Sequence, residues 1–432
     1  MSSFSLSSIA CHVFSLLLTF LLVLSCLFSN LSLAAAAKRS SSHVYVSHHR
    51  HSHRGHHNHP HPAAASDDSN PRLYRAFLAL QAWKHVIYSD PYNITTNWVG
   101  PSVCNYMGVY CSPALDDPNI QVVSGIDLNH RDIAGFLPEE FGLLSDLALI
   151  HLNSNRFCGI LPQSMANLTL LFELDLSNNR FVGPFPTVVL SLPTLGYLDL
   201  RYNEFEGPLP PELFSKKLDA IFVNNNRLTS VIPATLGGSS ASVVVFANNN
   251  FGGCLPPSIV NFANTLEELL LINTSLSGCL PQEVGFLYKL RVLDVSSNKL
   301  VGPIPYSLAG LSHLEQLNLA HNKLTGIVPA GVCCLPNLAN FTFSYNYFCE
   351  EEGTCQNLTS KGIAFDERRN CFPEKPYQRT QKECNAILEH PVDCFEYPCD
   401  SGGASASAPS IAAVPAATPL SSPPSAAAPT YT

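Results

Sequence analysis

Charge is scarce in this chain, and its distribution is uneven. Only 13% of the 432 residues are charged. No acidic residue precedes Asp67, whereas four of the 24 basic residues do, which leaves 20 basic against 33 acidic residues in the remainder. A nucleic-acid partner demands a basic surface because its phosphates are negative, so this balance argues against one. A basic partner and simple solubility explain the acidic excess about equally well.

Long apolar runs are also lacking, apart from residues 13–28 (VFSLLLTFLLVLSCLF). This run is shorter than the roughly 20 residues that a membrane-spanning helix needs. Small residues follow at Ala34–Ala37, so the pattern predicts a secretory signal over residues 1–37, although no positive charge precedes the run. Because no later stretch is apolar enough to span, we expect a secreted protein rather than a receptor with its own cytoplasmic domain.

Residues 38–66 contain nine of the 16 histidines. Clustered imidazoles can bind transition metals or gain charge below about pH 6.5. A metal site also needs an ordered scaffold, which this composition does not predict. We therefore interpret the segment as a disordered leader and expect no metal site.

The dominant feature of the sequence is a repeat that runs from Val122 to Phe348. Two copies read LFELDLSNNRFVGPFP and LGYLDLRYNEFEGPLP (residues 171–186 and 195–210), and the ten copies have a period of 23 to 25 residues. The pattern L-x-L-x-x-N-x-L at this period is typical of leucine-rich repeats. Its asparagine recurs as Asn155, Asn179, Asn203, Asn226, Asn249, Asn298, Asn322 and Asn346, and is missing only from the first copy (Arg131) and the seventh (Thr274).

Each recurring residue of the repeat has a physical role. The L-x-L pair predicts a short strand with alternate side chains pointing inward, and single repeats must stack to bury them. The asparagine amide turns inward, where it can satisfy backbone groups of the turn after the strand. The glycine permits a second bend and the proline after it fixes φ. The sequence thus predicts an α/β solenoid: a plant-type leucine-rich repeat horseshoe of about ten coils, with a helical N-terminal cap and a disulfide-rich C-terminal segment.

Cysteine-bearing segments flank the predicted array. A solenoid needs its first coil shielded, and residues 67–121 fit such a cap, with helical periodicity in LYRAFLALQAWKHVI followed by Cys104 and Cys111 at a spacing suited to a disulfide. Residues 349–400 hold six cysteines and are too short for a core of their own. We expect disulfides to hold this segment together, with Cys349 and Cys355 among the bonded residues.

Within the array, Cys254 and Cys279 occupy equivalent positions of adjacent coils. Such positions lie about 5 Å apart, near the Cα separation that a disulfide prefers, so we predict a bond between them. Removal of the signal leaves 13 cysteines, and the odd number requires a free thiol or an interchain bond. The least clearly partnered are Cys158, Cys333 and Cys334, and a disulfide-linked homodimer is a hypothesis.

Glycosylation signals agree with secretion. The sequon Asn-x-Ser/Thr occurs at Asn93, Asn167, Asn273, Asn340 and Asn357. Residues 401–432 consist of Ser, Ala, Gly, Pro and few others, and this composition predicts disorder.

The combination of segments resembles the plant leucine-rich repeat extensins. The resemblance covers residues 70–399 and rests on phrases such as LNSNRFCGILP and LDLRYNEFEGPLP, and most specifically on FDERRNCFPEKPYQRTQKECNAILEHPVDCFEYPC (Phe365–Cys399). In that family a long module of serines and prolines carries tyrosines that crosslink it into the cell wall. This chain departs from that pattern, because residues 401–432 contain one SPP and one tyrosine, Tyr431.

The resemblance implies a function. Members bind basic, cysteine-rich secreted peptides of the rapid alkalinisation factor type, form dimers, and act in cell-wall formation, integrity sensing and growth. It further implies pectin binding through those peptides, an indirect link to a plasma-membrane receptor kinase, and an extracellular location in the plant cell wall.

The candidate binding residues are those that alternate with the buried strand leucines, on the concave face of the solenoid. They are Glu173, Asp175, Asp199, Arg201, Tyr202, Phe222, Val245, Leu270, Ile272 and Asp294. Phe222, Val245, Leu270 and Ile272 are expected to form an exposed apolar run with acidic residues on both sides. A basic peptide with apolar anchors would need such a surface.

Two other functions compete with peptide binding. Polygalacturonase inhibitors share this repeat subclass, but residues 365–399 and the histidine-rich leader count against that class. A passive structural wall glycoprotein is the other. Enzyme activity is not expected: Asp175, Asp199 and Asp294 share a face, but no base, nucleophile or cofactor-binding cluster joins them. His151 is isolated in the sequence, and we expect it to contact a ligand.

Overall fold

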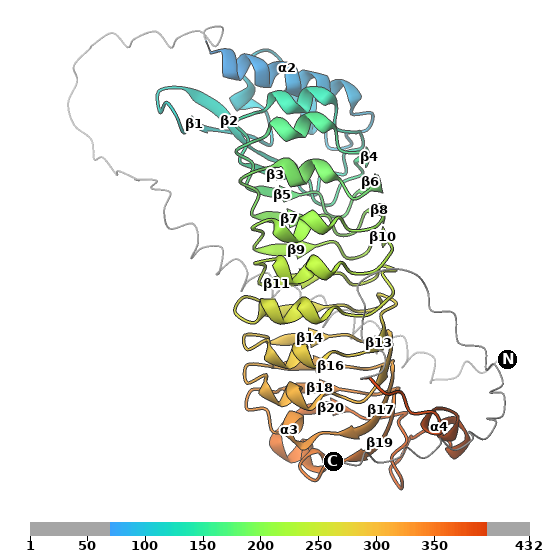
Figure 1. Cartoon of the computed structure of the whole chain (residues 1–432). Helices are drawn as coiled ribbons and strands as arrows, with labels where there is room; N and C mark the ends of the chain where they lie inside the picture. Colours follow the sequence, from blue (N-terminus) through green and yellow to red (C-terminus); the bar gives the residue numbers. More distant parts are fainter. Residues whose placement is uncertain (1–69, 395–432) are drawn as a thin grey trace, which may run out of the picture. The chain divides into compact units, whose positions relative to one another are not determined.

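The computed structural model describes residues 70–394 (Figure 1), with the side chain of Asn357 excepted. The predicted signal, the histidine-rich leader and residues 401–432 lie outside this range. In the described part of the chain, no helix has the length and apolar character needed to cross a membrane.

Stacked coils form the body of the described structure, as the repeat predicted. One strand per coil enters a sheet in which, among residues 70–394, twelve strands lie in chain order. These strands are β1 (Val109–Pro113), β2 (Gln121–Asp127), β3 (Leu149–His151), β5 (Glu173–Asp175), β7 (Tyr197–Asp199), β9 (Ala220–Phe222), β11 (Val243–Val245), β12 (Glu268–Leu270), β14 (Val292–Asp294), β16 (Gln316–Asn318), β18 (Asn340–Thr342) and β20 (Ala364–Asp366). Only β1 is antiparallel to its neighbour; every later pair is parallel and in register from coil to coil.

A second set of strands lies along another side of the stack (Figure 1). Two four-stranded sheets are described there: β4 (Cys158–Gly159), β6 (Arg180–Pro184), β8 (Glu204–Gly207) and β10 (Arg227–Leu228), then β13 (Ser277–Cys279), β15 (Lys299–Gly302), β17 (Lys323–Val328) and β19 (Tyr347–Glu351).

Short helices close the coils. The 3-10 helices of the array are η4 (Glu139–Leu143), η5 (Gln163–Asn167), η6 (Thr187–Ser191), η7 (Pro211–Ser215), η8 (Ala234–Gly238), η9 (Pro257–Phe262), η10 (Gln282–Phe286) and η11 (Tyr306–Gly310), and the α-helical turn α3 (Ala330–Cys333) follows in the next coil. The motif proline precedes each of them as the N-cap, where it has no N–H group that would need a partner. Its backbone is extended in eight of these nine places, and the exception is Pro186, with ψ 87°.

The N-terminal cap is helical, as predicted. Helix α2 (Pro71–Val86) begins with Asn70, whose side chain accepts hydrogen bonds from the backbone N–H groups of Arg72 and Leu73. The buried Trp83 of α2 packs edge-on against Phe141 of η4, with ring centroids 5.0 Å apart. The short helices η2 (Ile94–Asn97) and η3 (Val103–Asn105) complete the cap, which covers the apolar end of the first coil.

The motif asparagines form the predicted ladder. Asn179 is typical: its Nδ2 donates to the carbonyl oxygens of Leu152, Leu176 and Ser177 at 2.8–3.1 Å. Its Oδ1 accepts from the backbone N–H of Phe157 at 3.0 Å. Each asparagine thus joins the turn of its own coil to that of the coil before it.

The seventh coil keeps the ladder intact without an asparagine. The Thr274 hydroxyl donates to the Leu271 carbonyl at 2.9 Å, and Asn298 of the next coil accepts from the Thr274 N–H at 3.0 Å. The ladder also extends beyond Phe348, because Asn370 accepts from the Phe348 N–H and donates to the Phe343 carbonyl. Asn370 follows β20, so the start of the cysteine-rich segment adds one more coil to the stack.

The rest of the cysteine-rich segment packs on the last coils. It contains η12 (Cys355–Asn357), η13 (Thr359–Lys361) and helix α4 (Gln381–Leu388). A capping box begins α4, in which Thr380 and Glu383 hydrogen-bond each other's backbone N–H groups. Helix α4 lies against β19.

The disulfides correct part of the sequence prediction. Cys104 bonds to Cys111, as predicted. The predicted Cys254–Cys279 bond is wrong, because Cys279 bonds to Cys394. The C-terminal segment brings Cys394 to the seventh coil, and this long-range contact, which the spacing of neighbouring coils does not reveal, gives Cys279 its partner. Cys254 is also disulfide-bonded, to a partner other than Cys279.

Of the two cysteines expected to be bonded in the C-terminal segment, Cys355 is bonded as predicted and Cys349 is not. Cys355 bonds to Cys333, and Cys371 to Cys384. The free cysteines among the described residues are Cys158, Cys334 and Cys349, so Cys349 does not form the expected bond. Cys333 had no clear partner in the sequence. It lies in α3, and its partner Cys355 lies in η12 of the next coil.

Candidate functional site

The register of the main sheet brings the predicted binding residues onto one surface. We call this surface the strand face; it consists of the outward-pointing residues of β3, β5, β7, β9, β11, β12 and β14, together with the second residue after each strand. Asp175 lies beside Asp199, Asp199 beside Phe222, Val245 beside Leu270 and Leu270 beside Asp294. The predicted set therefore forms a continuous row across six coils.

His151 and Glu173 form a hydrogen-bonded pair at the N-terminal end of the strand face. Nε2 of His151 lies 3.0 Å from Oε2 of Glu173. The hydrogen bond to Glu173 raises the pKa of His151 above its ordinary value, and the bond to His151 lowers the pKa of Glu173. The carboxylate of Glu173 therefore holds His151 in place. The sequence had suggested an isolated histidine, and the structure instead pairs it.

Asp199 lies at the centre of the face and is completely buried. Its Oδ1 accepts from the Arg201 N–H at 3.0 Å, and its Oδ2 lies 2.9 Å from Nε of Arg201. Burial raises the pKa of Asp199 to about 7, and the nearby charge of Asp175 adds to this effect, while Arg201 opposes it. Tyr197 shares the site, and burial raises its pKa too.

Phe222 is not exposed as predicted. Only 7% of it is accessible, because the Arg201 guanidinium lies 5.0 Å above its ring and the Tyr197 ring is 5.9 Å away. Alternation along the strand correctly placed Phe222 on the outer face, but its neighbours cover it. The result is a rigid group in which a cation lies over an aromatic ring.

The apolar part of the strand face is accordingly shorter than predicted. Val245, Leu270 and Ile272 are half-buried and remain available for contact. Beyond them Asp294 accepts from the Ser296 N–H at 2.9 Å and from Nδ2 of Asn318 at 2.9 Å. Asp294 borders this strip of three apolar residues at one end. At the other end the strip meets Phe222 with Arg201 above it, and the acidic Glu173 and Asp175 lie further along the same face, three strands from Val245.

A row of residues with positive φ follows the strands. It comprises His130, Ser154, Asn178, Tyr202, Asn225, Asn248, Asn273, Ser297, His321, Tyr345 and Arg369, with φ between 51° and 59°. Tyr202, the third residue after β7, is 54% exposed and adjoins the strand face. His321 and Tyr345 stack, with ring centroids 4.2 Å apart and planes 11° from parallel.

Sequence reasoning missed part of this arrangement. It left Tyr197 out of the candidate set, although Tyr197 covers Phe222, and it did not pair His151 with Glu173. The stacked pair His321–Tyr345 was also missed. The signal was available in each case, since the partners occupy the same or neighbouring positions of adjacent repeats.

The sequon asparagines that the structure describes are accessible. Asn93, Asn167, Asn273 and Asn340 are exposed. Asn340 lies in β18 in the column of Gln316 and Ala364, so a glycan there would restrict the C-terminal end of the main sheet's outer surface. Nδ2 of Asn273 donates to Asn248 at 3.0 Å.

In the described range no cluster of three or more His, Cys, Asp or Glu side chains could hold a metal ion.

Comparison with known proteins agrees with the fold and extends it to a family. Residues 288–348 match the leucine rich repeat family model. The chain is 60% identical over 332 residues to leucine-rich repeat extensin-like protein 6 of Arabidopsis thaliana, covering 77% of this chain and 70% of that protein. The chain belongs to the leucine-rich repeat extensin-like family.

Other members of the family differ in how much of them is matched. The chain is 55% identical to leucine-rich repeat extensin-like protein 4 of the same plant over 79% of this chain and 69% of that protein. It is 59% identical to leucine-rich repeat extensin-like protein 3, but spans only 43% of that protein. The shared region of the family is thus the one that contains the coils.

Solved structures of plant receptors share the fold. A crystal structure of the LRR ectodomain of the Arabidopsis receptor kinase HAESA, in complex with an IDA peptide hormone, matches with 34% identity and a TM-score of 0.53, over 58% of this chain and 42% of that chain. The plant peptide hormone receptor RGFR1, in complex with RGF2, matches with 25% identity and a TM-score of 0.55, over 58% and 40%.

Proposed function

We propose that this protein binds a basic, cysteine-rich secreted peptide on the strand face, without catalysis, and acts in the plant cell wall in wall formation, integrity sensing and growth. The observation that carries the proposal is the strip Val245, Leu270 and Ile272 between acidic side chains on one accessible surface. Apolar side chains of a peptide would bury against the strip, and its basic residues would meet the carboxylates.

The family and the related folds support the same proposal. Relatives named leucine-rich repeat extensin-like suggest an extracellular wall protein, and the two receptor ectodomains are described in complex with peptide hormones. Exposed sequons and the disulfides at both ends of the array fit an oxidising, extracellular environment. Pectin would associate through the bound peptide, and a receptor kinase indirectly.

Calorimetry with an oxidised basic cysteine-rich signalling peptide, at two salt concentrations, tests the proposal on the full secreted chain. We expect tight binding that weakens as salt rises, because the carboxylates contribute through charge. Leu270→Glu should abolish binding, since it buries an unpaired charge in the apolar strip. Tyr306→Glu is the matched control: Tyr306 is 66% exposed on η11, away from the strand face.

Each alternative function gives a different result. Absence of peptide binding together with inhibition of a fungal polygalacturonase would assign the protein to the inhibitor class. Absence of both would leave a passive structural glycoprotein. Equal loss of binding in the Leu270→Glu and Tyr306→Glu variants would contradict the assignment of the site to the strand face.

A covalent homodimer is a further part of the proposal. Of the three free cysteines in the described range, Cys334 alone is exposed, while Cys158 and Cys349 are half-buried. We expect a species of twice the mass on a non-reducing gel, and its loss in the variant Cys334→Ser. Persistence of that species in the variant would exclude Cys334 as the interchain cysteine.

A further inference from the structure

One column of side chains on the second-sheet side of the array is apolar along most of its length. It contains the residue two positions before the motif proline in each of the first eight coils, and we call it the lateral column. Its members are Phe136, Ile160, Pro184, Pro208, Val231, Cys254, Cys279 and Pro303.

Neighbouring members of the lateral column lie directly against successive coils. A Cβ added at Gly183 would lie 3.2 Å from Cγ2 of Ile160, and one added at Gly253 would lie 2.7 Å from Cγ1 of Val231. Phe136, Ile160 and Val231 each cover the glycine of the next coil, whereas an added Cβ at Gly207 meets nothing within 4 Å. The column is thus closely packed at its N-terminal end and again at Val231, with a more open step after Pro184.

The C-terminal segment of the chain already covers the far end of this column. Helix α4 packs on β19 of the last coils. The chain then reaches Cys394, which bonds to Cys279 in the seventh coil. A Cβ at Gly302 would clash with Sγ of Cys394, so the segment lies against β15 on its way. The segment therefore runs back along the stack, toward the N-terminal coils, with its last described residue fixed on the lateral column.

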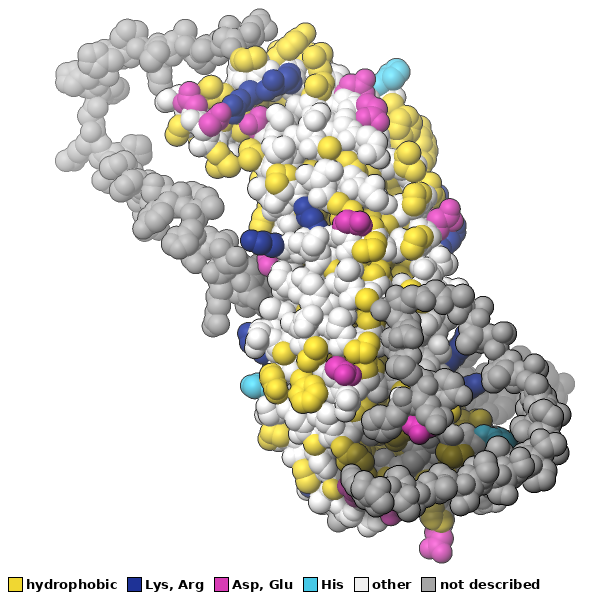
Figure 2. Space-filling view, viewed as in Figure 1, with side chains coloured by type: hydrophobic (Ala, Val, Ile, Leu, Met, Phe, Trp, Pro, Cys, Tyr) yellow, Lys and Arg dark blue, Asp and Glu magenta, His cyan; other side chains and the backbone are white. Residues whose placement is uncertain are grey.

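Cys254 is disulfide-bonded as well, and the column from Val231 to Phe136 is accessible to solvent within the described residues. Phe136 is 43% exposed, Ile160 64% and Val231 45%. Figure 2 shows apolar side chains along the edge of the upper coils on the side of β4, β6 and β8. Free apolar surface of this extent is unusual for a secreted monomer and indicates a contact surface.

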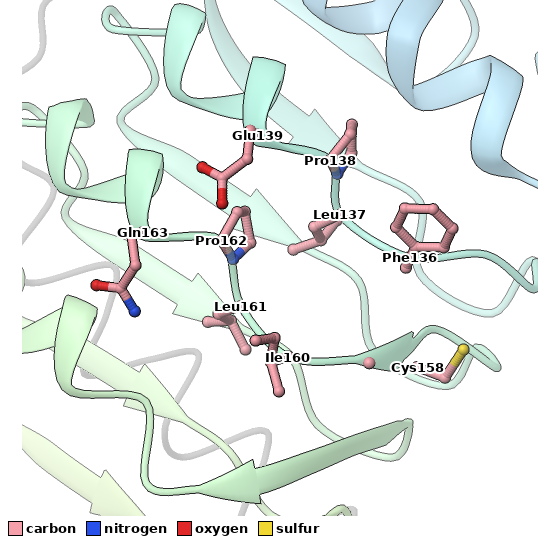
Figure 3. Close-up of a pocket in the computed structure, with 10 residues that line it drawn as sticks. Phe136, Leu137, Pro138, Glu139, Cys158, Ile160, Leu161, Pro162 and Gln163 are labelled. Atoms are coloured by element: carbon pink, nitrogen blue, oxygen red, sulfur yellow. The ribbon is translucent and has the colours of Figure 1, made fainter.

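A shallow groove lies at the N-terminal end of the column (Figure 3). It has a volume of about 400 Å³ and is lined mainly by apolar groups of two adjacent coils. Phe136 and Ile160 form its outer part, and Leu137, Leu161 and the two motif prolines Pro138 and Pro162 line it further in. Such a groove suits an extended, uncharged segment with small apolar side chains.

We propose that residues 411–420 of this same chain (IAAVPAATPL) lie along the lateral column between Val231 and Phe136. Residues 401–432 carry no charged side chain, and the segment alternates small apolar residues with prolines. Prolines favour the extended polyproline conformation, which apolar and aromatic grooves recognise at low entropic cost. The segment matches the surface in both charge and shape.

The length of chain is sufficient for this contact. Six coil steps separate Cys279 from Phe136, a distance of roughly 29 Å at a strand spacing of about 4.8 Å. An extended chain covers that distance in about 10 residues at about 3.1 Å per residue. Ile411 lies 17 positions after Cys394. The Cys279–Cys394 bond holds the segment near the surface, so its effective local concentration is high and even weak contacts are occupied.

Photo-crosslinking of the full secreted chain tests the proposal. Benzoylphenylalanine in place of Ile160 should form an intramolecular link to residues 411–420, mapped by mass spectrometry. The same group in place of Tyr306, which is 66% exposed on η11, is the control and should give no such link. A double substitution in the segment, Val414→Asp with Leu420→Asp, should reduce the link from position 160 at least fivefold.

Three results would overturn the proposal. A link from position 160 to a second copy would show that the column is an interface between copies. A link to another part of the chain would place a different segment there, and the absence of any link would show that the column is free. These results do not depend on peptide binding, because the lateral column and the strand face lie on different sheets.

Discussion

The buried carboxylate of Asp199 meets the guanidinium of Arg201 at 2.9 Å, and this guanidinium lies over the ring of Phe222. The arrangement places one cation and one ionisable acid at the centre of the strand face. When Asp199 is ionised the pair is neutral overall. When Asp199 gains a proton, Arg201 keeps its charge without a counterion, so the centre of the face becomes positive.

Asp199 should make the stability of the protein fall as pH rises. Burial raises its pKa to about 7 in the folded state, whereas an aspartate in an unfolded chain titrates near pH ~3.9. Between these values the folded protein holds a proton that the unfolded chain has released. The stabilisation is complete below the lower pKa and is lost as pH rises through the folded one.

The variant Asp199→Asn checks this expectation in urea titrations from pH 4.5 to 8. Its stability should fall less steeply with pH than that of the wild type, by up to about 1.4 kcal/mol per pH unit. Glu351 contributes with the same sign, because burial raises its pKa to about 7 as well. Glu351→Gln is therefore the matched comparison. A slope of stability against pH that is unchanged in Asp199→Asn would contradict the raised pKa of Asp199.

Removal of one ladder asparagine should destabilise the array. Asn179→Ala leaves the buried N–H of Phe157 without its partner. The carbonyl oxygens of Leu152, Leu176 and Ser177 keep one other hydrogen bond each. A buried unsatisfied group costs about 1–3 kcal/mol, so we expect a loss of about 1–3 kcal/mol in the free energy of unfolding. Asn264→Ala, at an exposed position, is the control. Equal midpoints for the two variants in chemical denaturation would exclude a stabilising role for the ladder.

Two glycines with the same backbone conformation should respond differently to alanine. Gly302 has φ +76° and Gly207 has φ +75°. A Cβ at Gly207 meets nothing within 4 Å, whereas one at Gly302 clashes with Sγ of Cys394 and lies 3.0 Å from Sγ of Cys279. Gly207→Ala should cost only the left-handed conformation, about 1–2 kcal/mol.

Gly302→Ala should lose about 1 kcal/mol more than Gly207→Ala, because the disulfide must also shift. Thermal unfolding of both variants provides the comparison. Similar losses for the two would mean that the C-terminal segment is not packed against β15. Because φ is the same at both positions, the difference between the variants isolates the contact with the disulfide.

The Cys279–Cys394 bond should stabilise the C-terminal segment and not the array. The variant Cys394→Ser removes a crosslink between residues 115 positions apart, but each coil contacts mainly its neighbours. We expect faster hydrogen exchange in α4 and little change in β5 or β7. Asn264→Ala, at an exposed position, should leave exchange in both regions as in the wild type. A uniform increase throughout the coils would contradict this local role.

The coils were predictable because each residue of the repeat acts within its own coil or the next one. The ladder position of Asn179 and the extended conformation of Pro162 both follow from a 24-residue neighbourhood. The partner of Cys279 was not predictable in the same way. It depends on the path of a segment more than a hundred positions away, and no local pattern determines that path.

The candidate site shows the same division. Alternation along β9 correctly turned Phe222 outward, but its exposure depends on Tyr197 and Arg201 in the preceding coil. Their long side chains reach across the strand spacing, and the sequence does not say in which direction. Val245 and Leu270 remain half-buried, so the prediction of accessible apolar side chains was correct there.

The residues with positive φ after each strand have a consequence for how such a protein can diversify. At these sites the backbone geometry is the same whether the side chain is histidine, serine, asparagine, tyrosine or arginine, so coil stacking, and not the identity of the residue, maintains it. Substitutions there can alter what the surface displays while the coils keep their register. A lineage can therefore retarget such a scaffold to new ligands by single exchanges along one row, without insertions or a redesigned core.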